Sequence, residues 1–323
     1  MKYTFLVPAY KRRHFKEAVN SMLGQTFGDY QIVISDDCSP EGLAELTAEL
    51  QTGDKGEKIV YHSNRENIGG LHLVNHWNQL VEQCKSDFLV MASDDDVYSP
   101  DFLAEVDRLV SKHPEVDVVR ARVQMINDAG EPTAREDIFE EFQTELEAVN
   151  AIFCGRYIGC IGNYVFRTSA LRQAGGFVYQ PYAWFSDLLT VINLLDKGQA
   201  NTKDVLFSFR LSGENISSTA KNKRMDRMKL SATIGYDEWM SRFAQKINFE
   251  PTTLNRRLYD DFVAAFKHRA YGQCGDYSWS LPIWKWPSLY KALAKHEGFS
   301  KTSFLKYFSI AVSNRILGSC VQR

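Results

Sequence analysis

The chain has 323 residues, of which 44% are hydrophobic, so it is longer than one typical domain and can bury a sizeable core. No stretch approaches the roughly 20 apolar residues that cross a bilayer, and we therefore predict no transmembrane helix. The formal net charge is −2. The six cysteines form no CxxC pair and show no zinc-like spacing. Their distribution indicates reduced thiols and a cytoplasmic location.

Strand and helix patterns alternate along the first part of the chain. The expected strands are residues 3–7, 31–35, 58–62 and 88–92, which are short apolar runs. The segments between them carry apolar residues at helical spacing, as in the set Phe15, Ala18, Val19, Met22 and Leu23. Strands that alternate with helices imply right-handed crossovers, so we predict an α/β fold with a mostly parallel sheet flanked by helices.

Polar residues follow three of these strands directly. Pro8 to Tyr10 come after the first strand, Asp36 and Asp37 after the second, and Asp94 to Asp96 after the fourth. Ligands of such sheets bind outside the carboxyl ends of the strands. The three polar groups therefore converge on one edge, and this convergence indicates a site.

The three consecutive aspartates, Asp94 to Asp96, repel one another unless a cation lies among them. Magnesium and manganese on nucleotide substrates are commonly held by one or two carboxylates, with the remaining positions left for phosphate oxygens. The alternative interpretation is a solvated acidic turn that caps a helix starting near Pro100.

A further strand is predicted over residues 205–209, ending at Arg210. Ser186 and Asp187 precede a predicted helix over 188–195. Asp187 can cap this helix, and a carboxylate near a helix N-terminus is stabilised as the anion.

The last third of the chain is basic. Residues 219–323 hold 18 Lys and Arg against 8 Asp and Glu, and the basic residues alternate with tryptophan, tyrosine and phenylalanine. We expect helices over 222–247, 252–271 and 304–317. Such a composition suits an anionic membrane surface or an acidic partner, and the alternative is a helical subdomain whose aromatic residues form its core.

Seven short motifs occur in order along the first two thirds of the chain. They are Phe5–Lys11, Ser21–Phe27, Ile34–Ser39, Asn67–Gly69 with Asn75, Ser93–Asp96, Phe166–Phe177 and Phe185–Leu189. In this order they resemble the motifs of the family 2 glycosyltransferases, which have the nucleotide-sugar-binding GT-A fold. Two positions depart from the family pattern, since Cys38 stands where glycine is usual and Ser186 where many relatives have glutamate.

The resemblance implies a Rossmann-like GT-A domain over residues 1–218, followed by a basic, aromatic-rich helical region over 219–323. The implied activity is that of an inverting, metal-dependent glycosyltransferase of the hexosyltransferase type. It would move a sugar from a nucleotide donor, expected to carry UDP, during surface polysaccharide synthesis. The alternatives are a sugar-nucleotide nucleotidyltransferase and a non-catalytic nucleotide-sugar-binding module. A nucleotidyltransferase of this kind commonly has a glycine-rich loop after its first strand. The corresponding residues here, Pro8–Arg13, contain no glycine.

The resemblance also assigns the nucleotide contacts. Pro8 and Ala9 would offer backbone groups, and Tyr10 would stack on the base. Asp37 would bind the edge of the base, and Asn67 belongs to the same nucleotide-binding set. Each has a structural alternative: Tyr10 can be a half-buried loop residue, and Asp37 can cap a turn or helix.

The remaining assignments concern metal, phosphate and catalysis. Asp95 and Asp96 would hold Mg²⁺ or Mn²⁺ against the diphosphate, while Asp94 would contact the ribose or help to position the ion. Arg210 would belong to a loop that closes over the diphosphate. Asp187 would be the general base that takes the proton of the acceptor hydroxyl.

The expected partners are a nucleotide-sugar donor and a saccharide or lipid-linked acceptor, with no nucleic acid. The C-terminal region would touch the inner membrane face peripherally or form a homo-oligomer.

Overall fold

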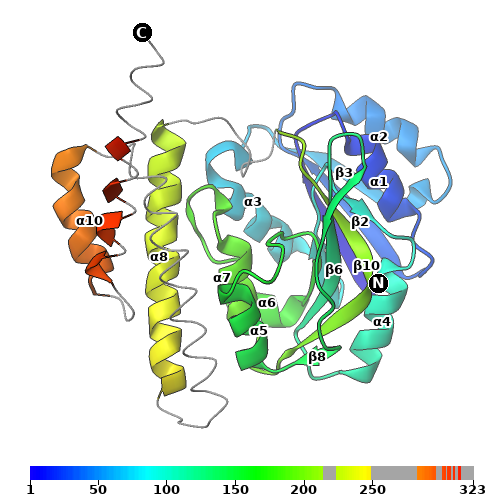
Figure 1. Cartoon of the computed structure of the whole chain (residues 1–323). Helices are drawn as coiled ribbons and strands as arrows, with labels where there is room; N and C mark the ends of the chain where they lie inside the picture. Colours follow the sequence, from blue (N-terminus) through cyan, green and yellow to red (C-terminus); the bar gives the residue numbers. More distant parts are fainter. Residues whose placement is uncertain are drawn as a thin grey trace. The chain divides into compact units, whose positions relative to one another are not determined.

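The structure is a computed structural model that describes residues 1–213, 223–248, 282–295, 300–302, 304–306, 308–309 and 312–313. Its contacts divide the chain into two compact units (Figure 1). Unit 1 comprises residues 1–148, 157–179 and 186–219, and unit 2 comprises residues 149–156, 180–185 and 220–323. Each unit is described by itself.

The first half of the sheet in unit 1 is parallel, as predicted. Its strands are β1 (Tyr3–Ala9), β2 (Tyr30–Asp36), β3 (Ile59–Ser63) and β4 (Phe88–Met91), in the spatial order β3-β2-β1-β4. The register pairs Ala9 with Asp36, and Asp36 with Ser63. Strands β1, β2 and β3 therefore end level with one another, β4 ends opposite Leu6 of β1, and the loops that follow them leave from one edge of the sheet.

The second half of the sheet is mixed. Strand β9 (Tyr164–Arg167) lies antiparallel between β4 and β6 (Val118–Ile126), and β10 (Gln199–Arg210) runs parallel to β6. The predicted strand 205–209 is thus the end of a longer one. Three short strands complete the sheet: β5 (Val97–Tyr98) and β8 (Phe142–Gln143) pair with β10, and β7 (Pro132–Arg135) pairs with β6.

Helices cover both faces of this sheet (Figure 1). On one face lie α1 (Phe15–Leu23), α2 (Leu43–Gln51) and α4 (Phe102–Lys112), whose apolar stripes share one core with the sheet. On the other face lie α3 (Gly69–Gln83) and α6 (Thr168–Gln173). Unit 1 also contains η1 (Gly56–Lys58), α7 (Ser186–Ile192) and the start of α5 (Glu145–Phe153).

Aromatic residues fill the centre of this core. The ring of Phe5 lies 5.0 Å from that of Tyr98 and 6.1 Å from those of Tyr30 and Phe102, mostly edge to face. All four side chains are almost completely buried. Burying an apolar side chain of this size is worth about 1.5–3 kcal/mol, so these contacts hold β1 firmly against β2, β5 and α4.

Unit 2 is built around α8 (Lys223–Asn248), in agreement with the helix predicted over 222–247. Two earlier segments pack on α8 within this unit, where Tyr236 stacks on Phe185 at 4.4 Å and meets the ring of Phe153 at 6.0 Å. The ammonium of Lys229 lies 4.4 Å from the ring of Trp184, in the segment that also carries η2 (Pro181–Ala183).

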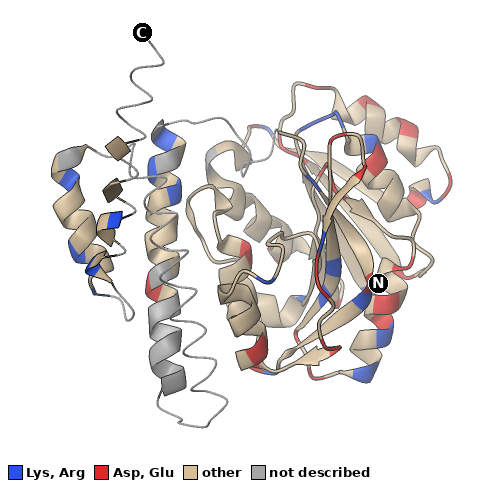
Figure 2. Cartoon of the chain, in the orientation of Figure 1, with Lys and Arg blue, Asp and Glu red and all other residues tan. Residues whose placement is uncertain are grey.

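The end of unit 2 is helical and basic where it is described. Here η3 (Ile283–Lys285) leads into α10 (Trp286–Leu293), and the described residues of 304–313 are helical. Leu289, Leu293, Phe304 and Phe308 form a small core with Leu230 of α8. Blue residues recur along these helices in Figure 2. The helix predicted over 252–271 lies outside the described residues.

Within the described segments, none of the helices combines the length and the apolar character that crossing a membrane requires.

Candidate active site

The loops after β1, β2 and β4 meet at one edge of the sheet. The backbone N–H of Asp37 donates to the carbonyl of Ala9 at 2.9 Å, and that of Ala92 donates to Leu6 at 2.8 Å. The structure thus brings together the groups predicted from sequence, Pro8 to Tyr10, Asp37 and Asp94 to Asp96. All of them lie in unit 1.

Asp94 ties the β4 loop to the β1 loop. Its Oδ2 accepts the backbone N–H groups of Tyr10 at 2.8 Å and Lys11 at 2.7 Å. The carboxylate is buried, and this burial raises its pKa despite the positive charge of Lys11 nearby. The same two hydrogen bonds fix the backbone of Tyr10, whose side chain is 42% exposed and offers a flat surface to a ligand.

Asp95 and Asp96 form a buried pair around a serine hydroxyl. Ser93 Oγ lies 2.9 Å from Asp95 Oδ1 and 2.6 Å from Asp96 Oδ2. Burial, and then the charge of Asp95, raise the pKa of Asp96 to about 7. Two buried carboxylates that share one hydroxyl group favour a proton or a cation between them.

These carboxylates fit a divalent cation that takes its remaining ligands from the substrate. In the described part of the chain, no group of three or more His, Cys, Asp or Glu residues is arranged to hold a metal ion. Mg²⁺ at nucleotide sites is usually bound by one or two carboxylates together with phosphate oxygens and water. A pair of buried carboxylates supplies that minimal set.

Lys11 brings a positive charge to the same carboxylates. Its Nζ lies 2.5 Å from Asp95 Oδ2 and 3.4 Å from Asp94 Oδ1. Burial opposes the charged ammonium, but Asp94 and Asp95 outweigh this effect and raise the pKa of Lys11. An ammonium group therefore contacts one of the two aspartates predicted to bind metal.

Arg210 holds the aspartate turn, residues Asp94 to Asp96, in position. Its backbone N–H donates to Asp96 Oδ1 and its Nε donates to the carbonyl of Asp95, both at 2.8 Å. The side chain is only 1% exposed, and its Nη2 pairs with Glu17 of α1 at 2.7 Å. Arg210 thus reaches the predicted site, but its guanidinium is directed at the protein backbone and Glu17.

Asp37 is held by the start of α3. Its Oδ1 accepts Asn64 Nδ2 and the N–H of Ile68, both at 2.9 Å, and its Oδ2 accepts the N–H of Gly69 at 2.6 Å. A Cβ atom on Gly69 would lie 2.9 Å from that Oδ2, so this close approach requires glycine. The backbone N–H groups at the start of α3 therefore hold the carboxylate of Asp37 in place.

Asn67 closes the same loop. Its Nδ2 donates to the carbonyl of Asp37 at 3.2 Å, and its Oδ1 accepts the N–H of Gly70 at 2.8 Å. Asn67 is exposed. Asn67 therefore fixes the position of Asp37 and remains accessible to a ligand.

Asp36 has a different environment from its neighbour. Its Oδ2 accepts the hydroxyl of Tyr61 and its Oδ1 the N–H of Ser39, both at 2.7 Å. Burial and then this hydrogen bond raise the pKa of Tyr61 to about 12. Asp36 thus stabilises the conformation of the loop that follows β2.

Asp187 lies in the first turn of α7, where the N–H of Leu188 approaches its Oδ1 at 2.8 Å. Burial raises its pKa to about 6, although the backbone N–H groups partly oppose the shift. Burial raises the pKa of the Cys160 thiol, and the negative charges of Asp96 and Asp187 raise it further. The two carboxylates therefore lie within electrostatic reach of one segment, residues 157–163.

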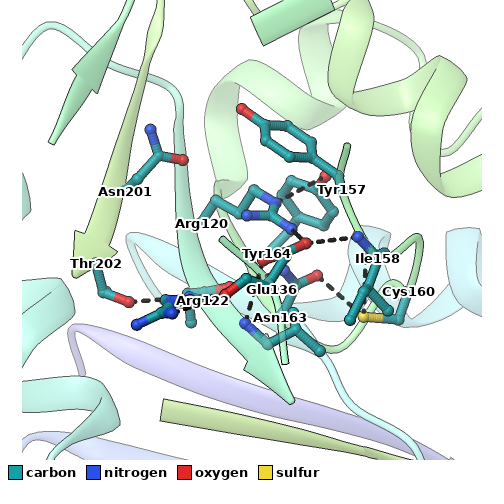
Figure 3. A network of polar contacts seen from close by, with 12 residues as sticks. Arg120, Arg122, Glu136, Tyr157, Ile158, Cys160, Asn163, Tyr164, Asn201 and Thr202 are labelled. Carbon is teal, nitrogen blue, oxygen red and sulfur yellow. Dashed lines mark hydrogen bonds and ion pairs between the residues drawn. The ribbon is translucent and has the colours of Figure 1, made fainter. Parts of the chain in front are cut away.

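A buried ion pair positions this segment (Figure 3). The side chains of Arg120 and Glu136 pair with each other and are each 1% exposed. Glu136 Oε1 accepts the N–H of Ile158 at 2.5 Å, and the guanidinium of Arg120 lies 3.8 Å from the ring centre of Tyr157. The segment is thereby anchored to β6 at its beginning.

The far end of the segment is held by backbone and side-chain contacts. Asn163 Nδ2 donates to the carbonyl of Ala121 at 2.8 Å, and the hydroxyl of Tyr98 donates to that of Gly162 at 2.9 Å. A Cβ atom on Gly162 would lie 2.7 Å from the ring of Phe207. Residues 157–163 are therefore fixed at both ends.

Sequence patterns missed Lys11, Ser93 and the Arg120–Glu136 pair as parts of this site. Ser93 and Lys11 adjoin predicted residues, so their position next to Asp94 and Tyr10 was an available signal. Arg120 and Glu136 are brought together by the pairing of distant segments. No local pattern distinguishes them from surface charges.

The comparisons with known proteins bear on the family and the fold. The sequence matches the family model described as Glycosyl transferase family 2 over residues 4–175. The structure is similar to S. aureus TarS 1–349 in complex with UDP-GlcNAc, with a TM-score of 0.63 at 16% identity over 98% of this chain and 92% of that one. The complex of TarS 1–349 with UDP gives a TM-score of 0.58 at 15% identity, with the same coverage.

A further similar structure is the mannosyltransferase PcManGT from Pyrobaculum calidifontis in complex with GDP-Man and Mn²⁺. It gives a TM-score of 0.53 at 14% identity over 98% of this chain and 87% of that one. Fold and site together define a glycosyltransferase with the GT-A fold. The family match covers more than half of the chain, which therefore belongs to glycosyl transferase family 2.

The buried ion pair generates a prediction about stability. Glu136→Ala leaves the Arg120 guanidinium buried without its partner, so we expect the free energy of unfolding to fall by about 3–5 kcal/mol. Urea denaturation followed by circular dichroism measures the change. Glu49→Ala is the control, because its ion pair with Lys16 is exposed and should leave the transition nearly unmoved. Equal transitions for the two variants would contradict the anchoring role of Glu136.

Proposed function

We propose that this glycosyltransferase transfers a sugar, with inversion, from a UDP-sugar to a saccharide or lipid-linked acceptor, and that it requires Mg²⁺ or Mn²⁺. The observation that carries the proposal is the presence in unit 1 of two kinds of buried carboxylate, the Asp95–Asp96 pair around Ser93 and Asp187 in the first turn of α7. The first suits a metal-bound diphosphate, and the second has the raised pKa of a base. The UDP and UDP-GlcNAc complexes of TarS support the nucleotide, and the GDP-Man and Mn²⁺ complex of PcManGT supports the metal.

The nucleotide would lie over the loops after β1 and β2. Tyr10 offers its exposed ring for stacking, a contact worth about 1–3 kcal/mol per base in nucleic-acid systems. Asp37 would accept the N–H of uracil through Oδ2, which accepts only the N–H of Gly69 and has a second lone pair. Pro8 and Ala9 contribute backbone groups, and Asn67 holds Asp37 in place.

The diphosphate would lie against the aspartate turn. Asp94 is committed to the N–H groups of the β1 loop, so Asp95 and Asp96 are the pair that would hold the cation, with Asp94 near the ribose. A divalent cation there neutralises charge that develops on the departing diphosphate. Arg210 would position this turn through the carbonyl of Asp95.

Asp187 would take the proton from the acceptor hydroxyl as that oxygen attacks the anomeric carbon. Its pKa of about 6 leaves the carboxylate ionised at neutral pH while making it a stronger base than an exposed aspartate. Residues 157–163, anchored by Glu136, would line one side of the site that the acceptor and the donor sugar share. Attack from the side opposite the leaving group inverts the anomeric centre.

The acceptor would belong to a surface polysaccharide under synthesis at the inner membrane face. Unit 2 supports this location through five exposed lysines in its described C-terminal part: Lys285, Lys291, Lys295, Lys301 and Lys306. Trp284 beside them is 78% exposed. A tryptophan next to lysines suits the boundary of an anionic lipid layer.

Replacement of the base tests the function directly. Asp187→Asn keeps the size of the side chain but cannot accept the proton, so we expect kcat for UDP release to fall at least about 100-fold. Calorimetry should show unchanged UDP binding in the presence of Mn²⁺. Asp196→Asn, an exposed aspartate beyond α7, is the matched control. A wild-type rate in Asp187→Asn would rule out Asp187 as the base, and the absence of UDP release from the wild type would favour a non-catalytic binding module.

The raised pKa of Asp187 predicts the acid limb of the pH profile. The carboxylate is the active form and is lost as the pH falls through about 6, well above the usual range of an aspartate. We expect kcat/KM to fall about tenfold per pH unit below that value. Rates measured with saturating Mn²⁺ from pH 5 to 8 check this, and a limb with its midpoint near pH 4 would contradict the assignment.

The C-terminal lysines predict affinity for anionic lipid, because each Lys near such a surface contributes about 1 kcal/mol. We expect the full chain to sediment with vesicles that contain phosphatidylglycerol and to stay in solution with phosphatidylcholine alone. Lys291→Glu combined with Lys295→Glu should weaken sedimentation, whereas Lys16→Glu in α1 should not. The absence of sedimentation with the anionic vesicles argues against a membrane contact. The solution mass then tests homo-oligomerisation.

A further inference from the structure

Lys11 holds an oxygen atom that the proposed metal also requires. Its ammonium lies 2.5 Å from Asp95 Oδ2 and 3.4 Å from Asp94 Oδ1. The other oxygen of Asp95, Oδ1, already faces the hydroxyl of Ser93 at 2.9 Å. A divalent cation on Oδ2 would meet the positive charge of this ammonium at close range, so cation binding at Asp95 favours the departure of Lys11.

The side chain of Lys11 can move while its backbone stays in place. The backbone N–H is fixed by Asp94 Oδ2 at 2.7 Å, in the same arrangement that fixes Tyr10. The ammonium is carried by four flexible methylene groups, and the side chain is 29% exposed. Asp94 and Asp95 are nearly buried, with side chains only 6% exposed, so the lysine is the mobile member of the pair.

We propose that Lys11 is an exchangeable counter-ion of the donor site. Without substrate, its ammonium neutralises Asp95 and keeps the divalent cation out. When the nucleotide sugar arrives with the cation, Lys11 leaves Asp95 and pairs with the diphosphate, whose negative charge replaces that of the carboxylate. The inference rests on the proposed function, because the diphosphate is the group that receives the ammonium.

This exchange makes cation and nucleotide bind cooperatively. Each ligand assists the other by releasing or capturing the same ammonium, and such a coupling must be equal in both directions. A lysine with only a structural role would behave differently. Its removal would lower stability and leave the coupling between Mn²⁺ and UDP as it was.

The test uses Lys11→Gln in the full chain, because glutamine keeps most of the length and removes the charge. Electron paramagnetic resonance measures Mn²⁺ binding without nucleotide, and calorimetry measures UDP binding at saturating Mn²⁺. We expect Mn²⁺ alone to bind at least about tenfold tighter, and UDP at least about fivefold weaker, than in the wild type; coupling of this size is typical of linked sites. Lys11→Ala, a second neutral variant, should give the same pair of changes.

Two control variants separate charge from position. Lys11→Arg keeps the positive charge, so its Mn²⁺ affinity should stay near that of the wild type. Lys16→Gln removes an exposed lysine of α1 that pairs with Glu49, and it should change neither affinity. Circular dichroism of every variant checks the fold.

The outcomes distinguish this inference from the function on which it rests. If the wild type binds UDP with Mn²⁺ but Lys11→Gln and Lys11→Ala bind Mn²⁺ alone no tighter than it does, the exchange is wrong and the proposed donor site stands. If the wild type binds neither UDP nor any UDP-sugar at saturating Mn²⁺, the proposed donor site itself is wrong. Tighter Mn²⁺ binding together with weaker UDP binding in the neutral variants supports both.

Discussion

Electrostatic repulsion among buried carboxylates is the constraint on which this site depends. The ends of β2 and β4 place several aspartates where water is scarce, and each needs a compensating donor or charge. Backbone N–H groups serve Asp94 and Asp37, and the ammonium of Lys11 serves Asp95. Asp96 remains the least compensated, as its raised pKa indicates. The same imbalance that costs stability makes the pair receptive to a cation.

Much of the parallel part of the fold, β1 to β4 with the helices between them, could be predicted from sequence, because local periodicity determines it. Apolar runs gave the four parallel strands, and helical spacing such as that from Phe15 to Leu23 gave the helices between them. The ends of parallel strands lie at one edge, so the meeting of Asp37 with Asp94 also followed from local patterns. The family motifs then supplied the chemistry.

The remainder depends on contacts between distant residues, which local patterns do not encode. The antiparallel insertion of β9 between β4 and β6 belongs to this class, as does the pairing of Arg120 with Glu136. Adjacent aspartates also look alike in sequence. Asp36 and Asp37 differ only because Tyr61 reaches the first and the start of α3 reaches the second.

The assignment of residues 149–156 and 180–185 to unit 2 bears on how this protein can be divided. Both segments precede residue 218, yet Phe153 and Phe185 bury their rings against Tyr236 of α8. A truncated chain that stops after β10 would lack Tyr236, and the side chains of Phe153 and Phe185 would be exposed to water. Shortened forms of the enzyme should therefore retain α8, or replace Phe153 and Phe185 with polar residues, to remain soluble.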